Sequence, residues 1–358
     1  MKAVSLFSGA GGMDIGFAKS GVTVIWANEL DADAAGTYER NNPDTVLRQG
    51  DIKALKKELS QFGDGTIDLV FGGPPCQGFS VAGKMDPDDE RSKLIWEFLD
   101  VVKTLKPKVF VMENVKALGK LQRWQSIREQ IVKNAFDMGY TCFYKVLNAA
   151  DFNVPQKRER VFFIGFHNVE FNVENLFESE MAKQVKPRIK LRDCLGKLPP
   201  VGTDGNPITC TAKISLAASP VMRKSPYAGM LFNGLGRPLD LDNQANTLPA
   251  SMGGNKTPVL DELLLKNSDA ENWVLRYHAN LNKGKTSSVQ ECVLSHIRRI
   301  TTVEAAAIQT FPPDYVFIGE KSSVYRQIGN AVPCNLAAAV AEATIKVHNR
   351  VLSQKISA

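Results

Sequence analysis

Residues 2–21 read KAVSLFSGAGGMDIGFAKSG, and this stretch decides the fold. The apolar run 3–7 predicts a buried strand, and residues 13–20 predict a helix. The glycine-rich turn 7–13 between them lets the backbone approach a ligand closely at a helix N-terminus. The turn is not the dinucleotide fingerprint, because Asp14 stands where the third glycine is required. The stretch therefore predicts a strand–turn–helix unit with a ligand site at the strand end.

Short β-rich runs alternate with helical patterns over the first 166 residues. The expected strands are 3–7, 23–28, 45–49, 68–72, 108–113, 142–147 and 161–166. The expected helices are 13–20, 31–41, 52–62, 92–105 and 122–138. Such alternation predicts an α/β fold with a doubly wound, mostly parallel sheet.

The texture changes after residue 186, where Pro and Gly become frequent and periodicity is poor. Helical patterns return at 302–309 and 333–347 and look like parts of the first domain resumed. The sequence thus predicts a first domain of residues 1–185 plus 296–358. Residues 186–295 are expected to form a second, smaller, loop-rich domain.

The net charge of +6 is unevenly distributed along the chain. Residues 186–300 contain 16 Lys/Arg and 9 Asp/Glu, whereas the remaining residues are nearly balanced. A basic segment suits a polyanion partner, although many basic surfaces bind nothing.

The cysteines and histidines exclude several classes of protein. No Cys-x-x-Cys pair is present, which excludes a disulfide framework and favours a reducing, cytoplasmic location. The four histidines form no metal-ligand spacing, so no metal site is expected. No apolar stretch is long enough for a transmembrane helix, so no membrane association is expected.

Two acidic residues close the next two expected strands. Glu29 follows the second strand, where an acid can accept hydrogen bonds from a ribose diol. Asp51 follows the third strand and could lie near an adenine amino group. Together they outline an adenosine-type ligand, and the alternative is that both acids only cap tight turns.

Residues 72–80 read GGPPCQGFS and hold Cys76 in a loop stiffened by two prolines. Its place after the fourth strand borders the crevice where ligands bind in this topology. The other five cysteines are expected to be inert.

Glu113 ends the fifth strand, and Arg158 and Arg160 precede the seventh. Separately, the acid and the two arginines could each be a surface charge. Jointly with Cys76 they make a nucleophile, a proton-sharing acid and a cationic anchor.

At this point the sequence resembles the DNA cytosine-5 methyltransferases of bacterial modification systems. The matching segments are Phe7–Met13, Asn28-Glu29, Gly50–Ile52, Gly72–Ser80, Glu113–Val115, Gln156–Arg160, Arg299–Pro312 and Gly329–Pro333. They occur in the family's order and leave out about residues 186–295, where the family carries its target-recognition domain. One departure is Ala307, where the family often has arginine.

The resemblance implies a Rossmann-like, S-adenosylmethionine-dependent fold and a reaction. The enzyme would transfer a methyl group to C5 of a cytosine flipped out of double-stranded DNA, leaving S-adenosylhomocysteine. Cys76 would attack C6 and form a covalent intermediate. Glu113 would contact N3 and the exocyclic amine, Arg160 would hold O2, and Arg158 would support the same pocket.

The resemblance also implies the cofactor contacts. Phe7 would contact the adenine, Glu29 the ribose hydroxyls, and Asp51 with Ile52 the adenine edge. The remaining expected cofactor residues are Gly9, Gly11, Gly12, Leu30, Gly73, Asn330 and Ala331. A contribution from Asn330 implies that the last helix packs back beside the first strand.

DNA contacts are expected from the basic segment and from the loop after the nucleophile. Ser80 and residues 81–91 could close over the flipped nucleotide, or form only a surface loop. The stretch 246–257 combines small, hydrogen-bonding and basic residues that suit base contact. The expected contact residues are Ser80, Arg223, Arg237, Thr247, Ser251, Asn255 and Lys256.

The leading hypothesis is a monomeric methyltransferase that protects host DNA from a cognate restriction endonuclease. A transfer-RNA cytosine-5 methyltransferase is disfavoured, because its Cys-Phe-Thr motif is absent and Cys142-Phe143-Tyr144 falls in an expected strand. A catalytically inactive DNA-binding relative is disfavoured, because Cys76, Glu113 and Arg160 are all present.

Overall fold

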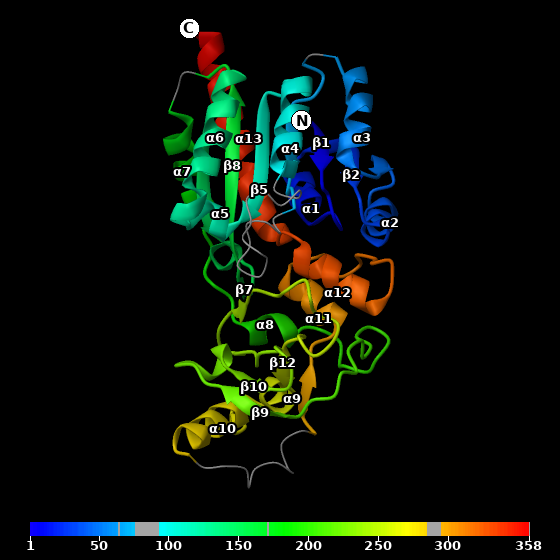
Figure 1. The fold of residues 1–358 in the computed structure, drawn as a ribbon, viewed down its shortest axis with the longest axis vertical. Helices are drawn as coiled ribbons and strands as arrows, with labels where there is room; N and C mark the ends of the chain where they lie inside the picture. Colours follow the sequence, from blue (N-terminus) through cyan, green and yellow to red (C-terminus); the bar gives the residue numbers. More distant parts are fainter. Residues whose placement is uncertain (64, 76–92, 170–171, 285–294, 358) are drawn as a thin grey trace. The chain divides into compact units, whose positions relative to one another are not determined.

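The computed structural model describes residues 1–63, 65–75, 93–169, 172–284 and 295–357. The chain forms two compact units (Figure 1). Unit 1 comprises Met1–Asn153, Arg158–Pro187 and Val332–Ala358. Unit 2 comprises Val154–Lys157 and Arg188–Ala331.

Unit 1 is built on a seven-stranded sheet with the order β3-β2-β1-β4-β5-β8-β6. The strands are β1 (Lys2–Leu6), β2 (Thr23–Glu29), β3 (Val46–Gln49), β4 (Leu69–Gly72), β5 (Val109–Val115), β6 (Tyr140–Asn148) and β8 (Glu159–His167). The first five strands in this order pair in parallel, and β8 runs antiparallel to both β5 and β6. The predicted α/β fold with a mostly parallel sheet is confirmed.

Helices cover both faces of this sheet. They are α1 (Gly12–Lys19), α2 (Ala32–Asn41), α3 (Ile52–Leu55), α4 (Leu94–Leu105), α5 (Lys116–Lys120), α6 (Gln125–Asp137), α7 (Val173–Gln184) and α13 (Cys334–Ser357), with 3-10 turns η1 (Lys56–Gln61), η3 (Gln122–Trp124) and η4 (Ala149–Phe152). On α4 the residues Ile95, Phe98, Leu99 and Val102 recur at helical spacing and are buried. They join one core with α5 and α6 against the sheet.

The opposite face of the sheet carries α1, α7 and α13. Phe17 of α1 stacks on Phe71 of β4, with ring centroids 4.2 Å apart. Helix α13 packs on α1 so closely that a Cβ at Gly16 would lie 2.5 Å from the Cβ of Ala337. Ser20 Oγ donates a hydrogen bond to the carbonyl of Ala338 at 3.3 Å. The last helix thus packs on the helix that follows the first strand.

The expected helix over residues 52–62 is the clearest local difference. The α-helix covers only Ile52–Leu55, and the chain continues as the 3-10 turn η1. The backbone amide of Phe62 bonds to the carbonyl of Leu59, three residues earlier, which is the tighter 3-10 pattern. Leu59 is buried in the core under α4, so the tighter turn still carries its apolar side chain inward.

Unit 2 is made of short elements. They are β7 (Gln156–Lys157), α8 (Leu191–Leu195), β9 (Leu216–Val221), η5 (Pro226–Ala228), β10 (Met230–Phe232), β11 (Ala245–Asn246), β12 (Val259–Asp261), α9 (Glu262–Lys266), α10 (Trp273–Asn282), β13 (Ile297–Arg299), α11 (Thr302–Ile308) and α12 (Lys321–Asn330). Strands β9–β10 and β12–β13 pair antiparallel, and β7–β11 pair in parallel.

The structure divides the chain differently from the sequence expectation. Residues 296–331, expected to resume the first domain, belong to unit 2. The reason is that Ile308 of α11 and Ile328 of α12 share a buried core with Leu191 and Leu260. Only α13 returns to unit 1.

Candidate active site

The topology of the sheet brings several predicted residues to one edge of unit 1. The parallel strands β1, β2, β4 and β5 all end at that edge. Because β8 is antiparallel to β5, its first residues lie at the same edge, with Arg160 opposite Val115. The edge therefore gathers the glycine turn, Glu29, the Gly-Pro-Pro segment, Glu113 and Arg160.

An ion pair joins Glu113 and Arg160. Arg160 Nε lies 2.9 Å from Glu113 Oε1, and both side chains are nearly buried. Burial raises the pKa of the Glu113 carboxyl above its usual range, while the nearby Arg160 and Arg158 guanidinium groups oppose that shift. Arg158 is itself buried. The predicted acid and both predicted arginines thus form one electrostatic group.

The segment leading to Cys76 lies directly against this acid. A Cβ on Gly73 would lie only 2.7 Å from Glu113 Oε2, so a larger residue at position 73 would have to displace the carboxylate that pairs with Arg160. Asn114 Nδ2 donates to the carbonyl of Pro74 at 3.1 Å and fixes the first proline. Cys76, Ser80 and residues 81–91 lie outside the described residues.

The glycine turn after β1 has the conformation that its sequence predicts. Gly9 and Gly11 have φ values of 56° and 77°, in the left-handed region that favours glycine. A Cβ on Gly9 would meet no atom within 4 Å, so the space above this backbone is open. Gly12 begins α1, and half-buried Phe7 packs against the sheet core with φ 53°.

Glu29 is held by two backbone amides. Its Oε2 accepts from the amide of Gly9 at 2.7 Å, and its Oε1 accepts from the amide of Asp31 at 2.8 Å. Burial raises the pKa of the Glu29 carboxyl, and these amide donors oppose that rise. The next residue, Leu30, is 67% exposed and presents an apolar side chain beside the carboxylate.

Asp51 caps α3, as the turn interpretation expects. Its Oδ1 accepts from the amide of Lys53 at 2.9 Å, and the residue is exposed. The side chain of Ile52 is buried in the core, so a cofactor contact by Ile52 would have to use its backbone. Capping and ligand contact are compatible, because Oδ2 is not used by this cap.

Asn28 is a positioning residue that the sequence reasoning did not assign. Its buried Nδ2 donates to the carbonyls of Gly50 at 2.8 Å and Arg48 at 3.3 Å. Its own carbonyl accepts from the amide of Ser8 at 2.9 Å. Asn28 thus ties the ends of β1, β2 and β3 together. The signal was a polar residue inside a buried strand.

The remaining predicted residues belong to unit 2. Asn330 ends α12 and Ala331 follows it, so their assignment to the cofactor stays a prediction. The expected DNA contacts Arg223, Arg237, Thr247, Ser251, Asn255 and Lys256 are all exposed. Thr247 Oγ1 donates to the carbonyl of Lys157, while Leu248 beside it is buried.

Comparison with known proteins supports one family. The family model for C-5 cytosine-specific DNA methylase matches residues 1–346. The Type II methyltransferase M1.HphI of Haemophilus parahaemolyticus is 32% identical over 359 residues, covering 96% of this chain and 87% of the relative. The Type II methyltransferase M.NgoPII of Neisseria gonorrhoeae is 32% identical over 352 residues, covering 98% and 97%.

A solved structure shows the same fold. The Dnmt2 methyltransferase of S. pombe superposes with a TM-score of 0.64 at 17% identity, covering 97% of this chain and 98% of that chain. The family match extends over both units and over every segment that carried the resemblance. The chain therefore belongs to the C-5 cytosine-specific DNA methylases and is a DNA cytosine-5 methyltransferase of the Type II restriction–modification kind.

Proposed function

We propose that this enzyme methylates C5 of a cytosine flipped out of double-stranded DNA, through a covalent bond between Cys76 and C6. The observation that carries the proposal is the buried Glu113–Arg160 pair, against which Gly73 packs three residues before Cys76. A base inside a duplex is out of reach of a protein thiol, so the reaction requires an extruded nucleotide.

The roles of the residues follow from their charges. The Cys76 thiolate forms the S–C6 bond, which turns C5 into an enamine-like carbon. Glu113 shares a proton with N3, which its raised pKa favours, and Arg160 stabilises negative charge at O2. Buried Arg158 supports the same group. C5 takes the methyl group, loses its proton, and the S–C6 bond breaks to release Cys76.

The edge of unit 1 fits S-adenosylmethionine, which supplies an electrophilic methyl group when bound and leaves as S-adenosylhomocysteine. The open space above Gly9 can admit the methionine part, and the Glu29 carboxylate can accept from the ribose. Exposed Leu30 and half-buried Phe7 offer apolar surface to the adenine. The other proposed contacts are Gly11, Gly12, Asp51, Ile52, Gly73, Asn330 and Ala331.

Replacing Glu29 tests the cofactor assignment. We expect Glu29→Ala to raise the Kd for S-adenosylmethionine by about ten- to hundredfold, because a charged hydrogen-bond acceptor is lost. Turnover at saturating cofactor should change by less than about threefold, since the carboxylate does not touch the reacting atoms. Calorimetric titration and steady-state kinetics measure the two quantities.

The matched control is Glu39→Ala, which removes an exposed acid from α2, the helix that follows the strand ending at Glu29. It should leave the Kd unchanged. An unaltered Kd in the Glu29 variant would show that the ribose lies elsewhere.

The proposal assigns DNA recognition to residues 186–295 and catalysis to residues 1–185 plus 296–358. The DNA contacts would be Ser80, Arg223, Arg237, Thr247, Ser251, Asn255 and Lys256. We further propose that the enzyme acts as a cytoplasmic monomer beside a cognate endonuclease and uses no metal ion. In the described part of the chain, no three His, Cys, Asp or Glu residues group as metal ligands, and no helix could cross a membrane.

The experiment is methyl transfer from labelled S-adenosylmethionine to unmethylated bacterial DNA, with bulk transfer RNA in parallel. Bisulfite sequencing of the labelled DNA follows. Label at one repeated short motif in DNA is the expected result and also reveals the recognition sequence. Label only in RNA would move the substrate to transfer RNA. Label in neither, with folded protein that binds DNA, would overturn the catalytic assignments.

A further inference from the structure

Arg299 is a buried cation in unit 2 that pairs with no carboxylate among the described residues. The side chain is 4% exposed and stands on β13. Its Nη1 donates to the carbonyl of Thr257 at 2.7 Å, its Nε to the carbonyl of Ala212 at 3.3 Å, and its Nη2 to Asn233 Oδ1 at 3.3 Å. Burial lowers the pKa of Arg299. Burying a charged guanidinium costs free energy, and the three hydrogen-bond acceptors offset only part of that cost. The buried arginine therefore calls for a functional explanation.

The three acceptors belong to three separate loops, which we call the clamped loops: residues 210–215, 233–237 and 253–257. Gly236 lies where two of these loops meet the guanidinium. A Cβ at this position would lie 2.2 Å from the carbonyl oxygen of Thr257 and 2.5 Å from Arg299 Nη1. The amide of Gly236 donates to the carbonyl of Asn255 at 3.0 Å. Only glycine allows the guanidinium and two loops to meet at this point.

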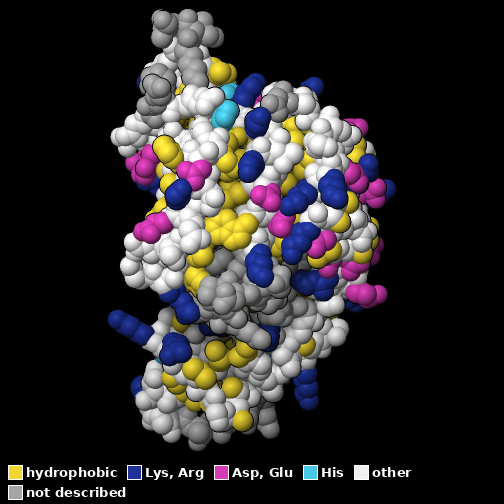
Figure 2. Space-filling view, turned by 45° about the horizontal axis from the view of Figure 1, so that its top comes forward, with side chains coloured by type: hydrophobic (Ala, Val, Ile, Leu, Met, Phe, Trp, Pro, Cys, Tyr) yellow, Lys and Arg dark blue, Asp and Glu magenta, His cyan; other side chains and the backbone are white. Residues whose placement is uncertain are grey.

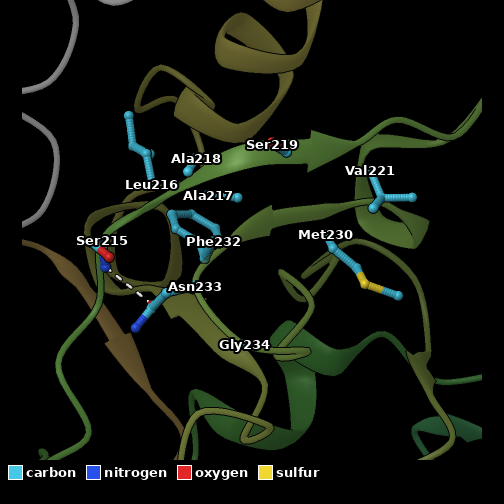
Figure 3. Close-up of a pocket in the computed structure, with 10 residues that line it drawn as sticks. All are labelled: Ser215, Leu216, Ala217, Ala218, Ser219, Val221, Met230, Phe232, Asn233 and Gly234. Carbon is cyan, nitrogen blue, oxygen red and sulfur yellow. Dashed lines mark hydrogen bonds between the residues drawn. The ribbon is translucent and has the colours of Figure 1, made fainter.

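Asn233 extends the same clamp to the first loop. Its Oδ1 accepts from the amide of Ser215 at 3.1 Å, and its Nδ2 donates to the carbonyl of Lys213 at 2.7 Å. Figure 3 shows Asn233 beside Ser215, at the end of a groove of about 400 Å³ lined by β9 and β10. One asparagine and one arginine therefore determine how the loops lie against each other.

The clamped loops carry exposed basic side chains. Lys213, Arg237 and Lys256 are exposed, and none pairs with an acidic residue in the described part of unit 2. Asn255, which directly precedes Lys256 in the sequence, is exposed as well. Unit 2 contains 18 Lys/Arg and 12 Asp/Glu, whereas unit 1 contains 26 of each, so unit 2 holds the whole net charge. In Figure 2 a few separate dark blue Lys and Arg side chains project from the lower part of the view, whereas dark blue and magenta side chains are mixed over the upper part.

We propose that the clamped loops form one DNA-reading face, that Arg299 is its positioning residue, and that Lys213 is a further DNA contact. The inference rests on the proposed DNA recognition by residues 186–295, and it adds Arg299, which lies in the same compact unit, to the residues that serve this recognition. Fixing three loops before DNA arrives removes the entropy cost of ordering them on binding. Exposed cations then contact phosphates, and Asn255 can reach a base edge. Arg299 itself touches no DNA.

Two substitutions loosen the clamp by different routes. Arg299→Lys keeps the charge but loses the planar fork of donors. Gly236→Ala drives a methyl group into the Thr257 carbonyl and the guanidinium. The readout is the ratio of kcat/KM for the cognate duplex to that for a duplex with one base pair changed. We expect this ratio to fall about tenfold in both variants, while turnover on saturating cognate DNA changes by less than about threefold.

The matched control is Gly63→Ala, where the nearest atom to an added Cβ is 3.8 Å away, and discrimination should be unchanged. S-adenosylmethionine affinity and thermal unfolding show whether each variant is folded. Unchanged discrimination in a folded Arg299→Lys protein would overturn the clamp. A wild-type enzyme that methylates no DNA would instead overturn the proposed function.

The proposed contact of Lys213 with DNA is tested by the salt dependence of DNA binding. We expect Lys213→Gln to lower the slope of log Kd against log salt concentration by about one, as one phosphate contact is lost. Lys283→Gln removes one exposed charge at the end of α10 and should leave the slope unchanged. Equal slopes in wild type and Lys213→Gln would remove Lys213 from the DNA face, and this measurement needs no correctly placed Arg299.

Discussion

Replacement of Cys76 by serine is expected to lower methyl transfer by roughly 10⁴-fold or more, while DNA affinity stays within about threefold of wild type. The thiol can ionise near neutral pH, whereas a serine hydroxyl cannot, and sulfur is the better leaving group when the S–C6 bond breaks. The scaffold around the loop is independent of this side chain, because Asn114 holds Pro74 and Gly73 packs on Glu113. Single-turnover kinetics and DNA titration measure both quantities.

Cys194→Ser is the matched control. Cys194 stands on α8, and burial raises the pKa of its thiol to about 11, so it stays protonated and unreactive. Its replacement should leave turnover near the wild-type value. Normal turnover in the Cys76 variant would remove Cys76 as the nucleophile and with it the covalent intermediate.

Glu113→Gln is expected to have the next largest effect, a fall in the single-turnover rate of about 10²- to 10³-fold. Because the pKa of Glu113 is raised, the protonated carboxyl persists to higher pH than an ordinary glutamate. The wild-type rate should therefore fall as pH rises through that pKa, when the proton shared with N3 is lost. Glutamine has no proton to lose, so this alkaline limb should vanish in the variant.

The pH profile separates a proton-sharing role from a merely structural one. Glutamine also leaves Arg160 without its charged partner, which lowers stability but cannot by itself remove a titration limb. Glu178→Gln removes an exposed carboxylate on α7 that pairs with Lys145, and should alter neither rate nor profile. An alkaline limb that survives in Glu113→Gln would assign the titration to another group.

Much of unit 1 could be predicted from the sequence, because its signals are local. Strands buried on both faces appear as short apolar runs, such as residues 109–112 at the start of β5, whatever their neighbours are. The meeting of Glu113 and Arg160 also follows from topology, since β8 runs antiparallel to β5 and therefore begins at the edge of the sheet where β5 ends. The 3-10 turn after Leu55 was less accessible, because helix ends depend on weak local preferences.

Unit 2 was harder to predict, since its organisation depends on contacts distant in sequence. Arg299 stands beside Arg298 in the sequence, but the two lie in different surroundings. Arg298 pairs with Glu304 at 2.7 Å, while Arg299 enters a space that exists only because residue 236 is glycine. The placement of residues 296–331 in unit 2 likewise depends on apolar side chains from Leu191 to Leu264. No local pattern encodes either fact.

The contact of α13 with α1 affects the order in which the chain can fold while it is being synthesised. Ser20 and Ala338 are 318 residues apart, so a ribosome needs about 15 to 60 s to make the second partner after the first. During that interval the α1 surface around Gly16 has no helix to cover it. A growing chain is thus expected to engage chaperones through this bare surface. Unit 1, although its first strand and helix are synthesised first, would therefore be completed last.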